Sequence, residues 1–423
     1  MGLSVAERLA KNGQRVLLLD AAHPIRGSWG VTRASHLRME DPTLLRMSLF
    51  SISQWLRLQE QYSRTGSQED THFYHRTGAM MAGPAEAIRG LADTVGHELA
   101  GEPEKGTFEV LDPAQAGQRF PQLRLDDSER LFFMPEGYTM LVPAAMASLA
   151  WAADRAGAKR EEASVVSVDR QRQVVTTEAG ESFKYSKLVL TVGPWTNRLL
   201  ESAGLAGMPV FVSNEQTVEL VPKEGSVAYD WNSFPLFTWS EAGYKGRGKD
   251  GGCLYFYTTP HVPVASSGSA GVKVGFHRQG PLLDTDDFRI AEGTEALKQQ
   301  LPHLRKELRK AQEFELDEFA LKRVQDFARA KLPGLEAEQP AGFMRCLYQM
   351  TPDMKMIVGR HPEDSNVAFA CGFSGSGFQF APAIADTLAA IVAGRELSAL
   401  HKEMLEKFDP RRFSIAAAAG SGQ

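Results

Sequence analysis

A run of mostly small residues near the carboxyl end constrains the fold most: Gly372-Phe-Ser-Gly-Ser-Gly377 stands between a predicted strand and a predicted helix. The strand is the apolar run 366–370, and the helix covers about residues 381–392. Small residues let the backbone approach a flat ring, and the dipole at the start of a helix stabilises negative charge. The segment therefore predicts a strand, a turn and a helix that cradle a planar, electron-rich ligand.

The amino-terminal segment predicts half of a nucleotide-binding unit. Residues 2–10 form a helix with an apolar face, and Asn12-Gly13 end it. The apolar run 15–20 predicts a buried parallel strand ending at Asp20, whose carboxylate would accept hydrogen bonds from a ribose. Gly2 can be only the last glycine of a GxGxxG turn, so we expect an incomplete gene model that lacks the first strand and the other glycines. An ordinary helix and strand without a nucleotide is the alternative for this segment alone.

Length, charge and cysteine usage narrow the class of protein. The chain has 423 residues, more than a single core of about 250 residues accommodates, so two domains are expected. Its net charge of −5 offers no long-range attraction for nucleic acid. The three cysteines lack metal-ligand spacing, and no apolar run approaches the roughly 20 residues that cross a bilayer. We therefore expect a cytoplasmic protein with no metal, no membrane and no nucleic acid among its partners.

A second carboxyl-terminal motif carries a resemblance to a known family: Cys346-Leu-Tyr348-Gln-Met-Thr-Pro352-Asp353, followed by the glycine run and Phe378. With this spacing the sequence resembles the monomeric sarcosine oxidase and N-methyltryptophan oxidase family of FAD-dependent amine oxidases, in the DAO superfamily. That family attaches FAD through a cysteine, so the resemblance implies a covalent bond between the sulfur of Cys346 and the flavin 8α-methyl carbon. Outside such a motif, a buried cysteine is usually a small hydrophobic residue.

The expected catalytic residues lie on separate segments. Residues 271–277 predict a strand that places Lys273 and His277 on one face. A lysine ammonium near a flavin supplies positive charge to dioxygen as it is reduced. The resemblance implies this role for Lys273, a substrate-pocket role for His277, and positions beside the flavin for Arg33 and Tyr348. An exposed strand lysine is the alternative for Lys273.

The resemblance also implies which residues contact FAD. Val165 falls where the family's adenosine-contacting strand lies, and Gly193-Pro-Trp195 resembles a family turn. The expected FAD-binding set is Gly2, Asp20, Ser28, Arg33, Val165, Gly193, Trp195, Cys346, Gly372, Phe373, Ser374, Gly375, Gly377, Phe378 and Gln379.

Two departures from the family limit the substrate. The family has a carboxylate-binding arginine where this chain has His36, and a lysine where it has Gln379. Desolvating a carboxylate without such cations is costly, which disfavours a small N-methyl amino acid. We expect a larger amine, a cyclic imino acid or a secondary metabolite, bound by His36, Tyr257, His277, Tyr348 and Gln379.

The order of elements predicts an α/β (α+β) fold with two interleaved domains. The region 209–280 is rich in aromatic and β-branched residues, as expected of an antiparallel sheet that covers a pocket. The Rossmann-like FAD-binding domain is predicted from segments 1–83, 142–208 and 331–423, and the antiparallel-sheet substrate domain from segments 84–141 and 209–330.

Together these features predict an FAD-dependent oxidase of a secondary or N-methylated amine, amino acid or cyclic imino acid that forms an imine and hydrogen peroxide. Three alternatives stay open: an amine dehydrogenase, an oxidative cyclase of secondary metabolism, and a flavin-free binding protein of the same fold. We expect a monomer with a small-molecule amine and dioxygen as its partners. The cytoplasm is the expected location, with the peroxisome left open.

Overall fold

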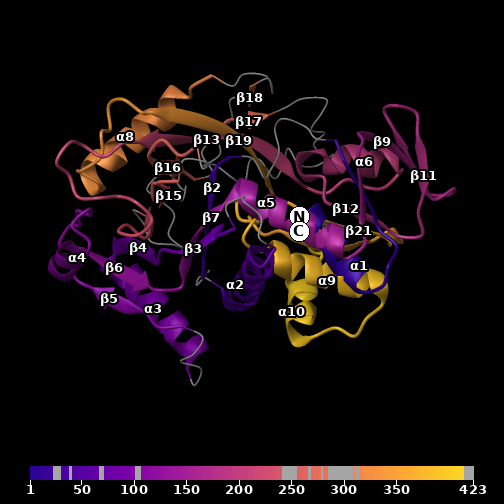
Figure 1. Ribbon diagram of the computed structural model, residues 1–423, viewed down its shortest axis with the longest axis horizontal. Coiled ribbons are helices and arrows are strands. Elements are labelled where there is room, and N and C mark those ends of the chain that lie inside the picture. Colours follow the sequence, from indigo (N-terminus) through magenta and orange to yellow (C-terminus); the bar gives the residue numbers. More distant parts are fainter. Residues whose placement is uncertain are drawn as a thin grey trace, which may run out of the picture.

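The computed structural model describes residues 1–21, 30–37, 41–65, 71–100, 106–240, 255–264, 268–277, 280–283, 308–309 and 315–413. Within these ranges one large sheet and four small sheets combine with helices packed around them, which confirms the predicted mixed α/β class (Figure 1). The helices are α1 (Gly2–Lys11), α2 (Pro42–Ser63), α3 (Ala85–Leu99), α4 (Pro113–Arg119), α5 (Val142–Arg155), α6 (Thr196–Ser202), α8 (Glu318–Lys331), α9 (Ala381–Ala393) and α10 (Ala399–Lys407), with a 3-10 turn η2 (Gly193–Trp195).

The large sheet has ten strands, of which nine follow one path and β19 pairs with β13. Helices α3, α4 and α8 flank this sheet on one side of the molecule (Figure 1). Its strands, in spatial order, are β18 (Leu308–Arg309), β17 (Leu282–Leu283), β13 (Phe211–Leu220), β16 (Val272–Phe276), β15 (Tyr255–Thr259), β14 (Leu236–Ser240), β4 (Ala79–Pro84), β6 (Glu129–Met134) and β5 (Glu109–Leu111), with β19 (Gly342–Met350) beside β13. Strand β13 pairs antiparallel with β16 and with β19, and β15 pairs antiparallel with β16. These pairings confirm the antiparallel character expected of this region.

The small sheets supply the other half of the molecule, where α1 packs against α5 and α9. Parallel pairing joins β12 to β21 and β1 to β8, as expected of a nucleotide-binding unit. The strands are β12 (Leu188–Leu190), β21 (Asp364–Cys371) and β20 (Ile357–His361); β1 (Leu17–Asp20) and β8 (Lys159–Glu162); β9 (Val165–Asp169), β10 (Val174–Thr177) and β11 (Ser182–Lys184); β2 (Thr32–His36), β7 (Gly137–Leu141) and β3 (Tyr74–Arg76).

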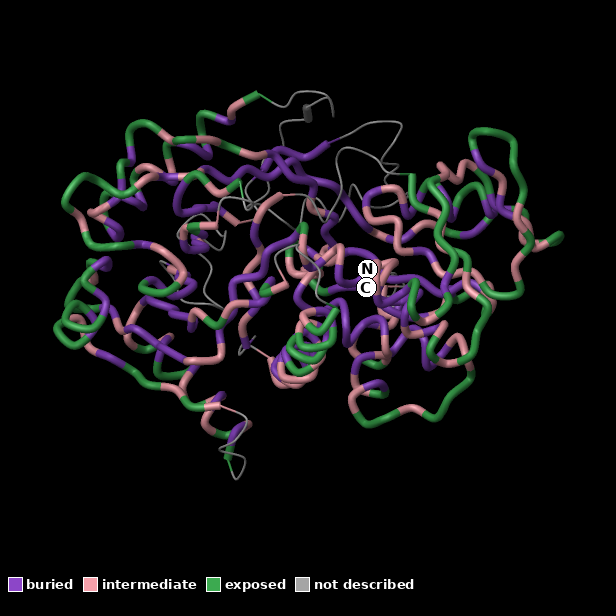
Figure 2. Tube along the Cα trace, viewed as in Figure 1, coloured by how far each residue is buried: buried purple, intermediate pink, exposed green. Residues whose placement is uncertain are grey.

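Helix α9 is the most thoroughly buried helix of this half and fixes the glycine run before it. Its residues are nearly all small or aliphatic, and those from Ala381 to Ala385 and from Thr387 to Ile391 are buried. Pro382 stands in the first turn, where its missing N–H costs nothing, and Gly394 ends the helix in the left-handed conformation. Figure 2 shows the buried trace running through the sheets and this helix, while exposed segments lie at the rim.

One expectation for the amino-terminal strand is wrong. We predicted a buried strand over 15–20, but β1 has an exposed residue at each end, and the Leu17 side chain is 37% exposed. Among the described residues β1 pairs on one edge only, with β8, and the cavity described below lies against it. Apolar composition alone could not reveal that an edge of this strand borders a cavity.

The strand pairing also bears on the five-segment division, which stays a prediction. The boundary expected at residue 83 falls inside β4, and the whole of β4 belongs to the ten-stranded sheet. Strand pairing therefore favours a boundary before Ala79. Within the described ranges no helix is long and apolar enough to cross a membrane.

Candidate functional site

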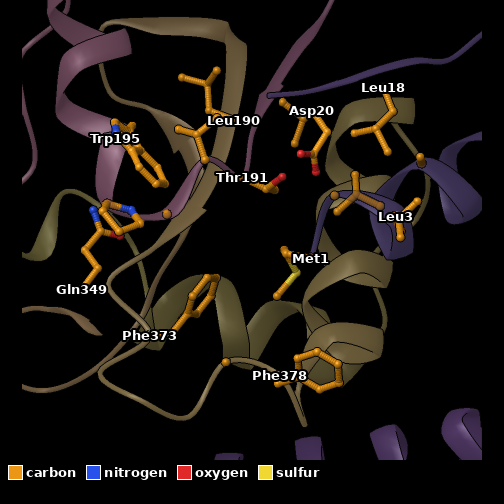
Figure 3. A pocket seen from close by; sticks show the side chains of 18 of the residues that line it. Met1, Leu3, Leu18, Asp20, Leu190, Thr191, Trp195, Gln349, Phe373 and Phe378 are labelled. Carbon is orange, nitrogen blue, oxygen red and sulfur yellow. The ribbon is translucent and has the colours of Figure 1, made fainter. Parts of the chain in front are cut away.

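A cavity of about 1430 Å³ lies between the ten-stranded sheet and the half of the molecule that contains α1 and α9. This is larger than the roughly 300–1,000 Å³ of pockets for single small ligands, so it suits an elongated cofactor with a substrate beside it. In Figure 3, Trp195 and Gln349 lie on one side of this space and Met1 and Leu3 on the other. Phe373 and Phe378 lie along its lower edge.

One part of the cavity wall comes from α1, β1 and β9. Asp20 is the last residue of β1 and lines the cavity, as the prediction of a ribose contact requires. Gly2 begins α1, and a Cβ atom there would lie 3.1 Å from the Leu18 side chain, so the helix start packs closely on the strand. Val165 at the start of β9 also lines the cavity. The structure therefore brings the residues expected at the adenosine end together.

Another part of the cavity wall contains Cys346, a buried free cysteine on β19. It lies opposite Glu215 in the antiparallel pairing of β19 with β13. Burial raises the pKa of the Cys346 thiol to about 11, and Arg33 and Lys273 act in the opposite direction. The sulfur thus carries its proton at neutral pH in the protein alone, and the two nearby cations favour its ionised form.

Lys273 and Arg33 converge on one backbone oxygen and form what we call the cationic wall. Lys273 lies on β16 with its side chain buried, and Nζ donates to the Thr32 carbonyl oxygen at 2.5 Å. Arg33 Nη1 on β2 donates to the same oxygen at 2.9 Å. Burial, followed by the charge of Arg33, lowers the pKa of Lys273 from 10.5 to about 7. The lysine is therefore poised to gain or lose its proton near neutral pH.

Two tyrosines and a histidine line the same part of the cavity, and we call them the tyrosine roof. Tyr257 and Tyr348 share a side-chain hydrogen bond, and burial raises the pKa of both phenols above their ordinary range. The His277 ring lies edge-on to both, with centroids 5.9 Å from Tyr257 and 5.5 Å from Tyr348. A Cβ atom at Gly275 would lie 2.4 Å from the Tyr257 ring, and one at Gly375 would lie 2.3 Å from the Tyr348 ring. Both tyrosines therefore need a glycine beneath them.

The glycine turn, residues Gly372–Gly377, divides into a front and a back. Phe373, Gly375 and Gly377 line the cavity, as does Phe378 just after the turn. Gly372 and Ser374 do not line it; both have positive φ, and a Cβ atom at Gly372 would lie 2.5 Å from Thr351. Their role is to shape the turn, whereas the other residues present the surface that a ligand would meet.

His36 and Gln379 form a second face of the cavity, which we call the neutral wall. The His36 backbone N–H donates to Gln379 Oε1 at 3.1 Å, although the two residues are 343 positions apart. The Gln379 carbonyl oxygen accepts a hydrogen bond from Trp55 Nε1 at 3.1 Å, and Trp55 is fully buried. The two positions at which the chain departs from the family are thus direct neighbours, and neither carries a fixed charge.

Three further residues were expected to contact FAD: Gly193, Trp195 and Ser28. Gly193 lines the cavity, has positive φ and begins η2, and its carbonyl oxygen accepts a hydrogen bond from the Thr196 hydroxyl at 2.6 Å. Trp195 lines the cavity and packs with Leu347. Ser28 lies outside the described residues.

Sequence reasoning missed two features of the site. The Thr32 carbonyl oxygen joins Lys273 to Arg33, and a backbone atom has no sequence signature. Gln349 also lines the cavity and lies inside the motif that begins at Cys346, so its place in the motif was a signal that could have found it. Among the described residues no cluster of three or more His, Cys, Asp or Glu could hold a metal ion.

The residues present fit an FAD molecule. One continuous cavity is lined by Asp20, by Cys346, by residues of the glycine turn and by Phe373 and Phe378. A Cβ atom at Gly375 would meet the Tyr348 ring and one at Gly377 the Phe373 ring, so the two glycines let these aromatic side chains line the cavity beside the turn.

Comparisons with known proteins agree with this arrangement. The sequence model of the DAO family, described as FAD dependent oxidoreductase, matches residues 1–391. The chain is 26% identical to human peroxisomal sarcosine oxidase over 432 residues, covering 100% of this chain and 95% of that protein. It is 26% identical to monomeric sarcosine oxidase of a Bacillus species, covering 92% and 88% of the two chains. Its fold is similar to that of NikD, described as an unusual amino acid oxidase essential for nikkomycin biosynthesis, with a TM-score of 0.68, 22% identity, and 94% and 92% of the two chains covered.

Proposed function

We propose, because the chain belongs to the DAO family of FAD-dependent oxidoreductases, that it oxidises a secondary or N-methylated amine, amino acid or cyclic imino acid to an imine. Dioxygen is the electron acceptor and hydrogen peroxide the second product. The sarcosine oxidases among its relatives support the amine, and the cavity supports the residue assignments that follow.

The cationic wall carries this proposal. Lys273 and Arg33 share one carbonyl oxygen as acceptor, and that oxygen carries only a partial negative charge. Two positive groups held beside Cys346, in a buried place, favour any species there that gains negative charge. Dioxygen gains such charge as it accepts electrons. We assign its activation to Lys273, and to Arg33 the task of stabilising negative charge on the adjacent ring.

Bound FAD supplies the two-electron oxidation of the carbon beside the amine nitrogen. Cys346 would hold that cofactor through its sulfur, for which the thiol proton must be lost, and the nearby cations favour this loss. Asp20 and Val165 would hold the adenosine part, and the start of α1 at Gly2 would face the pyrophosphate. Trp195, Phe373, Gly375, Gly377 and Phe378 would line the remaining length.

The substrate would lie between the tyrosine roof and the neutral wall. Tyr257, Tyr348 and His277 offer aromatic faces that attract a cationic amine or pack against an apolar one. His36 and Gln379 offer hydrogen-bonding groups without a fixed positive charge. Such a pocket favours a larger amine or a cyclic imino acid over a small amino acid whose carboxylate needs a cationic partner.

Two further properties are part of the proposal. We infer a monomer, since one relative is a monomeric sarcosine oxidase. The cytoplasm stays the expected location, and a peroxisomal relative supports the peroxisome as the alternative. An amine dehydrogenase would use the same cavity but pass its electrons to an acceptor other than oxygen. An oxidative cyclase would still form peroxide, with its imine captured internally to form a ring, and a binding protein of this fold would hold no flavin.

A panel of amines, mixed anaerobically with the flavin-loaded protein, tests the function. A substrate bleaches the flavin absorbance, and admission of oxygen restores it with one peroxide formed per amine oxidised. Bleaching that oxygen does not reverse would favour the dehydrogenase. A preparation that never takes up flavin would refute the oxidase.

Acid precipitation tests the covalent bond separately. The flavin should stay with the precipitated chain, and Cys346→Ala should release it into the supernatant. The other buried free thiol offers a matched control, because Cys371 does not line the cavity, so Cys371→Ala should retain the flavin. Flavin that stays attached to Cys346→Ala would place the bond elsewhere.

A further inference from the structure

Gln349 holds the glycine turn with both its main chain and its side chain. Its carbonyl oxygen accepts a hydrogen bond from the Ser374 backbone N–H at 2.9 Å. Its side-chain Oε1 accepts from the Gly372 backbone N–H at 2.9 Å. The β19 strand and the turn are therefore fastened together at two points by one residue.

The second of these bonds fixes which way the side-chain amide points. The Gly372 N–H can only donate, so the atom facing it must be the oxygen, and the NH₂ group must be on the other side.

The NH₂ group so oriented has no partner among the residues that the structure describes. Gln349 is 6% exposed and lines the cavity, and Figure 3 shows its side chain beside Trp195 and above Phe373. A buried N–H without an acceptor costs about 1–3 kcal/mol, which makes an orphan donor at a cavity wall a sign of an absent acceptor.

We infer that Gln349 Nε2 donates a hydrogen bond to an oxygen atom of the bound flavin cofactor, so that one side chain both shapes the glycine turn and holds the cofactor. This rests on the flavin binding proposed above. It assigns Gln349 as a further cofactor-binding residue beyond the set predicted from the sequence. The competing explanation is a purely structural role, in which only the bond to Gly372 matters.

Two variants separate the explanations. Gln349→Glu keeps an oxygen to accept from Gly372 but replaces the NH₂ group by a second oxygen, so the turn keeps its bond and the cofactor loses its donor. Gln349→Met keeps the length of the side chain and removes both. Each variant is made in a Cys346→Ala background, so that a titration with FAD measures reversible binding, by the quenching of flavin fluorescence and by the rise in unfolding temperature.

The parent Cys346→Ala protein should bind FAD, and Gln349→Glu should bind it about 10- to 100-fold more weakly. Gln349→Met should show the same loss of affinity and, in addition, a lower unfolding temperature without FAD, because the Gly372 N–H loses its acceptor. Each variant is compared with its own FAD-free form, so a general loss of stability does not mimic the effect.

Gln122 supplies the matched control. It is 5% exposed, lies outside the cavity, and donates its amide NH₂ group to the Ala228 and Ser233 carbonyl oxygens. Gln122→Glu makes the same chemical change and should lower stability while leaving the affinity for FAD unchanged. Equal affinity of the parent and both Gln349 variants would overturn the inference while leaving the proposed function intact. A parent that does not bind FAD would overturn both.

Discussion

The cationic wall and the neutral wall face the same cavity but treat charge in opposite ways. Lys273 and Arg33 hold two positive groups on one carbonyl oxygen, and burial brings the lysine close to losing its proton. On the neutral wall, the His36 backbone N–H donates to the Gln379 side-chain oxygen, a hydrogen bond between two uncharged groups. Under the proposed function, this chain therefore places positive charge on the wall where dioxygen would be reduced. It has no fixed positive charge on the wall where the resemblance implies a carboxylate-binding cation.

Removing the charge of the cationic wall should have the largest effect. Lys273→Met is expected to slow the reaction of the reduced enzyme with oxygen by about 100- to 1,000-fold, the usual cost of losing one preorganised electrostatic group. Anaerobic reduction by the amine should change far less. Stopped-flow measurement of the two half-reactions checks this.

Lys223→Met is the control, because Lys223 Nζ also donates to a backbone carbonyl, that of Pro333, but lies at the exposed surface outside the cavity. It should leave both half-reactions unchanged. Equal slowing of the two half-reactions in Lys273→Met would contradict the role assigned to this lysine.

Adding charge to the neutral wall should have the next largest effect. His36→Arg or Gln379→Lys would give a substrate carboxylate a charge-assisted hydrogen bond, which is worth about 1.5–3 kcal/mol. The KM for sarcosine should therefore fall by about 10- to 100-fold relative to that for an amine without a carboxylate.

His75→Arg is the control for this change, since His75 stacks on Trp231 and does not line the cavity. It should leave the ratio of the two KM values unchanged. Variants of the neutral wall that bind both amines equally well would show that this face does not contact the carboxylate.

The pH dependence of reoxidation should follow the charge of Lys273. Its folded-state pKa of about 7 keeps the side chain cationic below pH 7 and neutral above it. The rate of reoxidation by oxygen should therefore fall as pH rises through about 7, by at most roughly tenfold per pH unit. In Lys273→Met this step should vanish; a step of equal size in that variant would belong to another group.

The last comparison concerns stability and not rate, and contrasts two buried lysines. Because the pKa of Lys273 is about 7 when folded and 10.5 ordinarily, the unfolded chain binds more protons between these values. The resulting penalty to the fold is full below pH 7 and disappears above 10.5. Lys273→Met should thus raise the free energy of unfolding by about 1–3 kcal/mol near pH 6.

Replacing Lys331 should lower the free energy of unfolding instead, because Lys331 Nζ pairs with the carboxylate of the buried Glu129 at 2.7 Å. Lys331→Met leaves that carboxylate without its cation and should cost about 3–5 kcal/mol. Thermal unfolding from pH 6 to 9 measures both changes. Destabilisation of Lys273→Met below pH 7 would show that the buried cation has compensating partners.

The sequence predicted the elements of this fold better than their contacts. The helix from Gly2, the helix from about residue 381 and the strand over 366–370 follow from local patterns, because period and turn chemistry are written in neighbouring residues. The burial of β1 was predicted wrongly, since it depends on what lies beside the strand.

The residues of the site were likewise predicted better than the contacts between them. Cys346, Lys273 and His277 were found from motifs and strand alternation, and the structure brings them to one cavity. The meeting of His36 with Gln379 could not be predicted, because it joins the end of β2 to the turn before α9, 343 positions away. Nor could the convergence on the Thr32 carbonyl oxygen, because it depends on how β2 lies against β16.

The position of Trp55 has an optical consequence. Its indole is fully buried, stacks on Phe378 with ring centroids 5.9 Å apart, and donates to the Gln379 carbonyl oxygen, so it lies directly behind the wall that a bound ring would face. An indole in such dry surroundings emits at short wavelength, in a range that oxidised flavin absorbs. Excitation energy would pass from Trp55 to the bound ring, so the ultraviolet emission of the protein can report how much of a preparation carries its cofactor.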